Sequence, residues 1–303
     1  MIDVVTIGET LVTVRSDAVE PLAIGSHLRL SIAGAESNVA IGLARLGHTV
    51  RWVGLVGDDD FGRLVLRTLR GEGIDTSLTR IVPDAPTALL VKQHRLAQLS
   101  RVAYYRKGSA GSRLDRDVAL SALTDPPRLL HVTGITVALS DSASGAVSAA
   151  VGEARRNGVH VSLDVNYRAA LWSRADAAAS LRPLAALANT IFGSEDELEL
   201  VEPDSADATI VVKRGADGAE LYGTDGVSQE PALDVAAVDT VGAGDAFVAG
   251  YLSALLDELD PSSRLKRACA TAAFAVSTHG DWEGLPPRGE LPLLELDANA
   301  TLR

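Results

Sequence analysis

The stretch Asp239–Leu256, DTVGAGDAFVAGYLSALL, decides how the rest of the chain is interpreted. It begins with a polar, glycine-rich segment and continues as an apolar segment, Ala246 to Leu256, with helical character. Gly242 and Gly244 permit backbone angles and close approaches that a side chain would block. If a helix begins here, the free N–H groups of its first turn and its dipole form an anion site.

Asp245 stands inside this predicted anion site. Its carboxylate could serve as an N-terminal cap of the helix, which is the simpler interpretation. A cap alone, however, does not need a glycine on each side of Ala243. An anion hole beside a carboxylate suits phosphoryl transfer, in which donors hold the developing charge and a base orients the attacking hydroxyl. The pattern therefore favours a catalytic carboxylate.

The composition is that of an ordinary α/β protein. The chain has 303 residues, of which 47% are hydrophobic and 22% charged, and a core of this size needs no disulfide or metal support. The single cysteine excludes an internal disulfide and fits a reducing compartment. No basic segment precedes an apolar one near Met1, and no apolar run reaches the ~18 residues of a membrane span. We therefore expect a cytoplasmic protein without membrane partners.

The formal net charge of -12 argues against nucleic-acid binding, which needs a basic face. An anionic substrate must then be held by local cations that act against the overall field. The sequence offers such cations at 106–107, at 168 and at 213–214.

Strands and helices alternate along most of the chain. This alternation predicts a mostly parallel sheet with helices on both faces. Two β-only insertions, at about 11–32 and 86–105, are expected to join in a small sheet that covers the site as a lid. The predicted strands are 2–8, 50–56, 129–133, 159–164, 190–193 and 209–213, followed by a hairpin at 219–231, and the predicted helices are 37–46, 63–72, 142–157, 175–188, 246–256 and 263–278.

Two segments resemble the signatures of one family. The first is GAESN at 34–38, followed by Gly47 and Gly57, and the second is DTVGAGD at 239–245. In this order and at this separation they resemble the ribokinase-like, PfkB-type sugar kinases over essentially the whole chain. The resemblance implies one α/β domain over 1–303, a three-layer sandwich with a mostly parallel central sheet and a small β-sheet lid.

Within that family, the segments 104–110, 130–136 and 162–168, with Leu171 and Trp172, are similar to those of 2-keto-3-deoxygluconate kinases. The resemblance implies ATP-dependent phosphorylation of a small sugar acid, 2-keto-3-deoxygluconate, to its 6-phosphate. A fructokinase or ribokinase activity is the alternative within the family. A non-catalytic sugar or nucleotide sensor is the alternative from another class, although a sensor has no use for a base at Asp245.

The resemblance also assigns roles at the site. Asp245 takes the hydroxyl proton, and the N–H groups of Gly242, Ala243 and Gly244 face the phosphate. Arg168 forms a two-pronged pair with the substrate carboxylate, which a lysine cannot copy, and Arg106 reaches the same group; ordinary salt bridges are the alternative for both. Leu90 departs from the tyrosine that close relatives often present. The acceptor residues are Gly34, Asn38, Tyr104, Arg106, Ile135, Arg168, Asp245 and Asp281.

A second set of residues is expected along ATP, and Glu197 is expected to organise Mg²⁺ through water. Ser194 replaces the usual asparagine of the family. The acidic run at 195–197 could instead be a solvated helix N-terminus, the loop at 213–218 a simple turn, and Cys269 a packing residue. The resemblance leaves open a monovalent cation, K⁺, and a homo-oligomer formed through the lid. The nucleotide residues are Asn166, Ser194, Lys213, Gly215, Gly218, Gly242, Gly244 and Cys269.

Overall fold

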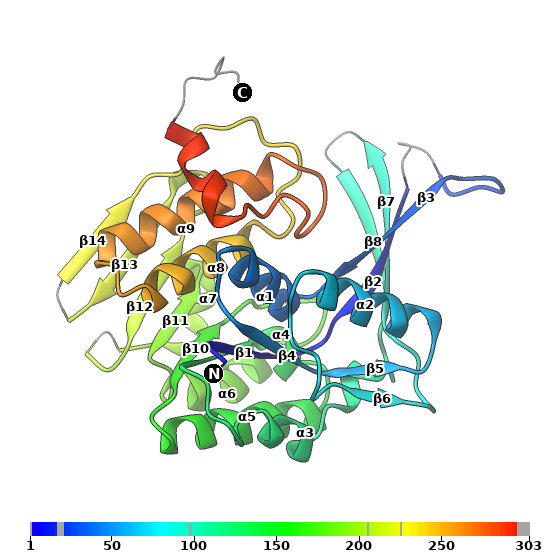
Figure 1. Cartoon of the computed structure of the whole chain (residues 1–303), viewed down its shortest axis with the longest axis horizontal. Helices are drawn as coiled ribbons and strands as arrows, with labels where there is room; N and C mark the ends of the chain where they lie inside the picture. Colours follow the sequence, from blue (N-terminus) through cyan, green and yellow to red (C-terminus); the bar gives the residue numbers. More distant parts are fainter. Residues whose placement is uncertain (1, 17–20, 97–98, 205, 225, 296–303) are drawn as a thin grey trace.

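The alternating strands and helices build one large sheet in the computed structural model, which describes residues 2–16, 21–96, 99–204, 206–224 and 226–295 (Figure 1). The eight strands lie in the order β14-β13-β12-β11-β10-β9-β1-β4. All neighbours from β4 to β12 are parallel, and β13 and β14 add an antiparallel hairpin at one edge. The strands are β1 (Val4–Ile7), β4 (Val50–Val53), β9 (Leu129–Thr133), β10 (His160–Asp164), β11 (Thr190–Gly193), β12 (Thr209–Lys213), β13 (Ala219–Gly223) and β14 (Gly226–Glu230).

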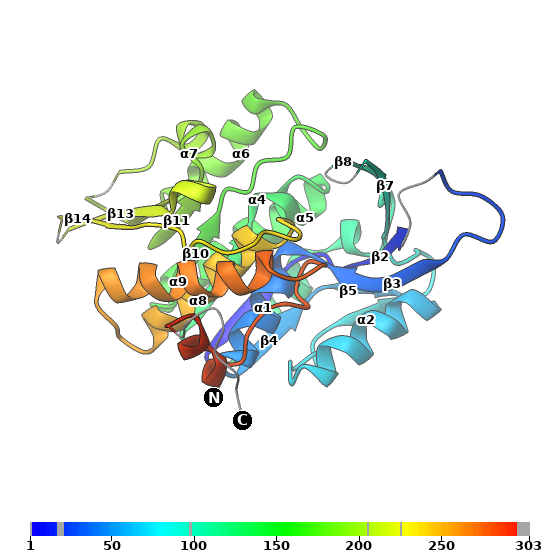
Figure 2. The ribbon, with the colours of Figure 1, turned by 90° about the horizontal axis from the view of Figure 1, so that it is seen from above.

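Helices cover both faces of this sheet, as predicted for a mostly parallel sheet (Figure 2). One face packs against α3 (Arg116–Ser121), α4 (Gly134–Val137), α5 (Asp141–Arg156), α6 (Arg174–Ala185) and α7 (Glu195–Val201). The other packs against α1 (Ala35–Arg45), α2 (Asp60–Gly71), α8 (Ala243–Leu256) and α9 (Pro261–Val276). The three-layer α/β class expected from the sequence is confirmed.

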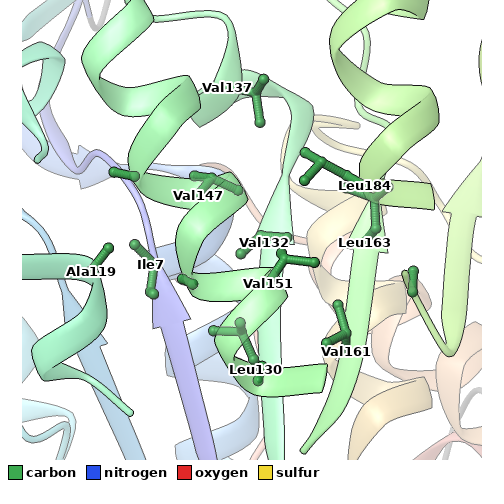
Figure 3. Packing of buried hydrophobic residues seen from close by; sticks show 14 of the residues in the cluster. Ile7, Ala119, Leu130, Val132, Val137, Val147, Val151, Val161, Leu163 and Leu184 are labelled. Carbon is green, nitrogen blue, oxygen red and sulfur yellow. The ribbon is translucent and has the colours of Figure 1, made fainter. Parts of the chain in front are cut away.

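Helix α5 shows how the sequence directs this packing. The Ser140 hydroxyl caps its N-terminus by accepting from the Ala143 N–H. Its small buried residues recur at helical spacing, so one face lies close to the sheet. Figure 3 shows Val147 and Val151 of this face among sheet residues such as Leu130. Burying one valine or leucine side chain contributes about 1.5–3 kcal/mol. The packing of α5 therefore stabilises the strands whose ends carry the site.

A second, four-stranded sheet lies beside the large one, with strand order β3-β2-β7-β8 (Figure 1). Its strands β2 and β7 are parallel, and the two outer pairs are antiparallel. The predicted pairing of the two β-only insertions is thus observed, and we call this element the small sheet. Its strands are β2 (Leu11–Ser16), β3 (Leu28–Ala33), β7 (Leu89–Leu96) and β8 (Leu99–Tyr105).

Some boundaries differ from the prediction. The strand expected at 50–56 is divided into β4 and β5 (Leu55–Gly57), and β5 pairs with β6 (Arg80–Val82). The division falls at Gly54, where a Cβ atom would lie 2.4 Å from the Gly8 carbonyl oxygen. Helix α2 begins three residues earlier than expected, because Asp59 caps it. Within the described ranges, no helix combines the length and the apolar character needed to cross a membrane.

Candidate active site

A cavity of about 990 Å³, which we call the pocket, lies between the small sheet and the carboxyl ends of strands in the large sheet. Ligand sites of open parallel sheets form at these ends. The loops that follow β1, β9 and β10 all reach the pocket, and the small sheet supplies the opposite wall. Its lining includes the predicted acceptor residues Gly34, Asn38, Tyr104, Arg106, Ile135, Arg168, Asp245 and Asp281.

The turn Asp239–Gly242, which we call the glycine turn, leads into α8 at one end of the pocket. Gly242 caps α8 with φ 77°, and a Cβ atom there would lie 2.0 Å from the Asp281 carbonyl oxygen. Glycine is therefore required at this position. Gly244 is exposed, and a Cβ atom there would meet nothing closer than the Lys213 Nζ at 3.7 Å. Helix α8 has no side-chain cap, although the Ala243 N–H donates to the Thr240 carbonyl oxygen at 3.4 Å. The anion site expected from the sequence at this first turn stays a prediction.

Asp245 occupies the first turn of α8 and lines the pocket. Its Oδ2 accepts a hydrogen bond from the Asn38 Nδ2 of α1 at 2.8 Å. The pKa of Asp245 is raised to about 6, chiefly by burial and also by the charge of nearby Asp164, although the Asn38 hydrogen bond acts in the opposite direction. The carboxylate is therefore held by Asn38 of α1. Because it caps no N–H group of α8, the structure does not fit the capping alternative. A carboxylate with this pKa can accept a proton near neutral pH.

Glu36, in the same signature segment as Asn38, is fully buried. Its Oε1 accepts from the hydroxyls of Thr133 and Thr136 at 2.8 and 2.6 Å. Burial raises the pKa of Glu36 to about 7, and the charge of Asp245 adds to this effect. The carboxyl thus joins the start of α1 to the end of β9 and to α4. Sequence reasoning did not select it, although Glu36 is the one charged residue between Ala33 and Leu43.

Arg106 reaches the pocket but is already paired. Its Nε and Nη2 donate to the Glu9 Oε2 at 3.0 and 2.6 Å, and the Ser109 hydroxyl donates to the other oxygen at 2.7 Å. Glu9 is only 3% exposed, so this is a buried pair, unlike the surface salt bridge considered as the alternative. The Arg106 guanidinium also lies 5.4 Å from the Tyr104 ring centroid. Glu9, which sequence reasoning missed, offsets the charge that Arg106 brings to the pocket.

Arg168 differs from Arg106 because it is exposed at the pocket wall. Among the described residues, its guanidinium has no hydrogen-bond partner and no close ion pair. It follows Asn166, which adopts the left-handed φ of 41°, a conformation that surrounding contacts must hold in place. The Tyr167 N–H between them donates to the Glu197 Oε1 at 2.8 Å. Glu197 thus fixes the loop that presents Arg168 to the pocket.

Both oxygens of Glu197 contact the backbone. Its Oε2 accepts from the Ser194 N–H at 2.8 Å, and the Ser194 hydroxyl accepts from the Glu197 N–H, which together form a capping box on α7. This is the helix N-terminus considered as the alternative for the acidic run. In the described ranges, no three His, Cys, Asp or Glu side chains converge to hold a metal ion.

Of the predicted nucleotide residues, Asn166 and Gly242 line the pocket, whereas the others are not part of its lining, namely Ser194, Lys213, Gly215, Gly218, Gly244 and Cys269. The Lys213 Nζ donates to both oxygens of Asp164 at 2.8 Å and lies next to Gly244. Gly218 is required by packing, because a Cβ atom there would lie 2.1 Å from the Glu230 carbonyl oxygen. Burial raises the pKa of Cys269 to about 12, which fits packing and not a reactive thiolate.

Asp281 and Asp245 both line the pocket. Burial raises the pKa of Asp281 to about 7, and the charges of Asp245 and Glu283 act in the same direction. The two acids therefore lie close enough to influence each other, and the charge of Arg168 also acts on Asp245 by lowering its pKa.

Comparison with known proteins identifies the scaffold that carries this arrangement. The family model described as pfkB family carbohydrate kinase matches residues 1–288. The chain belongs to the pfkB family of carbohydrate kinases. As a member of this family it is a carbohydrate kinase.

Three relatives of this pfkB kinase show how far the similarity extends. A 2-dehydro-3-deoxygluconokinase of Thermoproteus tenax is 38% identical, with 97% of this chain and 95% of the relative covered. An enzyme of the same name from Bacillus subtilis (strain 168) is 35% identical over 96% of this chain and 94% of the relative. The crystal structure of a PfkB protein from Polaromonas sp. JS666 superposes with a TM-score of 0.84 at 32% identity, covering 96% and 99% of the two chains. The similarity therefore spans the small sheet as well as the large one.

Proposed function

We propose that this pfkB kinase transfers the γ-phosphoryl group of ATP to a hydroxyl of a small sugar acid, 2-keto-3-deoxygluconate, and forms its 6-phosphate. The observation that carries the proposal is the position of Asp245. This carboxylate has a raised pKa and lies in the first turn of α8, which has no side-chain cap, inside a pocket that also presents an exposed arginine. The names of the two curated relatives, whose substrate is the same compound under its dehydro name, support the choice of acceptor.

In the proposed reaction, Asn38 orients Asp245, whose carboxylate accepts the proton of the attacking hydroxyl. The N–H groups of Gly242, Ala243 and Gly244 stabilise the charge on the transferred phosphoryl group, and the Lys213 ammonium lies near enough to assist them. Positioning and charge neutralisation supply most of the rate enhancement in such transfers.

Mg²⁺ would neutralise charge on the nucleotide phosphates. Each oxygen of Glu197 already accepts one backbone N–H, and a carboxylate oxygen can accept a second partner. Glu197 therefore fits a contact through water and not a direct bond. Asn166, Ser194, Lys213, Gly215, Gly218 and Cys269 stay proposed nucleotide residues.

The choice of an acid as acceptor is supported by the two arginines predicted to bind it, Arg106 and Arg168. Glu9 offsets Arg106, so Arg168 is the cation in the pocket wall that best fits a substrate carboxylate. A neutral hexose or pentose gives Arg168 no anionic partner, which disfavours a fructokinase or ribokinase. Leu90 lines the pocket from β7 and contributes an apolar surface where relatives often present a tyrosine.

The test is ADP release measured by a coupled assay over a panel of acceptors. The panel contains 2-keto-3-deoxygluconate, its C4 epimer, fructose and ribose. Turnover with the two acids and little with the neutral sugars supports the proposal. Turnover with a neutral sugar alone points to the fructokinase or ribokinase alternative, and the absence of turnover with any acceptor points to a sensor.

Four further properties belong to the proposal. The small sheet closes over the bound acid as a lid, so sugar should protect 86–105 from proteolysis; unchanged cleavage would indicate a rigid flap. Exposed hydrophobic side chains on this sheet, such as Leu30 and Tyr105, suit a homo-oligomer, which light scattering tests. The protein acts in the cytoplasm, and replacing K⁺ by Na⁺ in the assay shows whether a monovalent cation takes part.

A further inference from the structure

An ion pair crosses from the small sheet to the glycine turn. The Lys92 Nζ, carried by β7, lies 3.0 Å from the Asp239 Oδ2 and 3.3 Å from its Oδ1. The two side chains are only 13% and 10% exposed, so the pair is largely removed from solvent. Because breaking a buried ion pair leaves an uncompensated charge, each partner constrains the position of the other.

Asp239 in turn shapes the glycine turn. Its Oδ1 accepts a hydrogen bond from the Val241 N–H at 3.2 Å. Its backbone N–H and that of Val238 both donate to the Val276 carbonyl oxygen at the end of α9. Gly242, which follows Val241, is the N-cap of α8 and packs against the Asp281 backbone. The Asp239 carboxylate therefore lies between the Lys92 ammonium and the backbone that forms the anion site.

At β3, the small sheet contacts the rest of the protein through hydrogen bonds. The Trp282 Nε1 donates to the Ile32 carbonyl oxygen at 3.1 Å, and the Ser31 hydroxyl donates to the Glu283 Oε1 at 2.6 Å. These bonds join β3 to the loop at 280–284, and the second is exposed to solvent. Lys92 thus joins the small sheet to the glycine turn itself through an ion pair.

We propose that Lys92 is a positioning residue for phosphoryl transfer: its ammonium holds Asp239, and through it the glycine turn, so that the anion site at α8 is fully formed while the small sheet covers the pocket. The lid and the anion site are then coupled through one side chain. This inference rests on the proposed kinase activity, and it concerns kcat more than substrate affinity, because Lys92 acts through the turn.

The experiment compares Lys92→Met, Lys92→Arg, Asp239→Asn and the Lys92→Met/Asp239→Asn double variant with the wild type, in full-length protein. ADP release by the wild type comes first, since its absence would count against the proposed function and not against this inference. Asn at 239 keeps an oxygen for the Val241 N–H and removes only the charge. Arg101→Met is the matched control, because Arg101 is an exposed cation of β8 outside the pocket lining.

We expect Lys92→Met to lower kcat by about 10- to 100-fold, since a displacement of about 1 Å in a catalytic site can cost that much. The KM values for ATP and acid should change by less than about threefold, Lys92→Arg should restore most of kcat, and Arg101→Met should behave as the wild type. The double variant should be no slower than the slower single variant, because both remove the same contact.

A Lys92→Met enzyme with kcat within about twofold of the wild type would overturn the proposal, as would additive losses in the double variant. Thermal unfolding of each variant separates loss of fold from loss of rate. If Lys92→Met does not fold, Asp239→Asn decides the question: a tenfold lower kcat at unchanged KM supports the coupling, and an unchanged kcat contradicts it.

Discussion

Replacing Arg168 by lysine tests how the pocket selects an acid. Arg168 lies exposed at the pocket wall without a partner among the described residues, whereas Arg106 is offset by Glu9. A guanidinium can bind a carboxylate with two parallel hydrogen bonds, but an ammonium binds it as a point charge. One charge-assisted hydrogen bond contributes about 1.5–3 kcal/mol. Because this side chain is exposed, we expect the lower end of that range, which corresponds to about a tenfold weaker interaction.

The assay measures KM for 2-keto-3-deoxygluconate and for ATP in wild type, Arg168→Lys and Arg168→Met. KM for the acid should rise about tenfold in the lysine variant and further in the methionine variant, while KM for ATP stays within about twofold. Arg155→Lys on α5 is a matched control, since Arg155 is exposed and lies outside the pocket lining. Equal increases of both KM values would refute the reasoning and place Arg168 away from the acceptor.

Two further predictions concern the raised pKa values at the site. With an Asp245 pKa of about 6, kcat/KM should be constant above pH 6 and fall about tenfold per pH unit below it, because only the ionised base accepts the proton. Asn38→Leu removes a hydrogen bond that lowers the pKa of Asp245, so the inflection in the pH–rate profile should move to higher pH. An inflection at the same pH would mean that another group titrates. The pKa of Glu36 is raised from 4.5 to about 7 in the folded protein. Its protonation therefore stabilises the native state fully below pH 4.5, and this contribution is lost as the pH rises through 7. In urea unfolding, the free energy of unfolding of Glu36→Gln should decline less between pH 5 and 8 than that of the wild type, and an identical decline would contradict a buried, protonated Glu36.

The sequence predicted the elements of the site better than their connections. The glycine turn, Asp245 and the small sheet follow from local rules, namely glycine geometry, helix N-terminal chemistry and strands without intervening helices. Glu9 and Arg106 lie 97 residues apart and pair only because β1 and β8 end at the same side of the pocket. No local pattern encodes such a pairing, and the same holds for Lys92 and Asp239, which are 147 residues apart.

Glu197 shows how one residue can have two interpretations from the sequence. The acidic run at 195–197 was expected either to organise Mg²⁺ or to begin a helix, and Glu197 does begin one, through its capping box with Ser194. The same carboxylate holds the Tyr167 N–H and so the loop of Asn166 and Arg168. The acidic character of the run suggested a helix N-terminus, but the contact with a loop 30 residues away required the register of β10 and β11.

The most direct test of the account is kcat of Asp245→Asn with 2-keto-3-deoxygluconate, with ATP binding measured on the same protein by calorimetry. Asparagine keeps the size of the side chain and removes the base. We predict that kcat falls by at least ~10²-fold while the affinity for ATP is unchanged. Turnover close to that of the wild type would contradict the assignment of Asp245 as the base and, with it, the proposed mechanism.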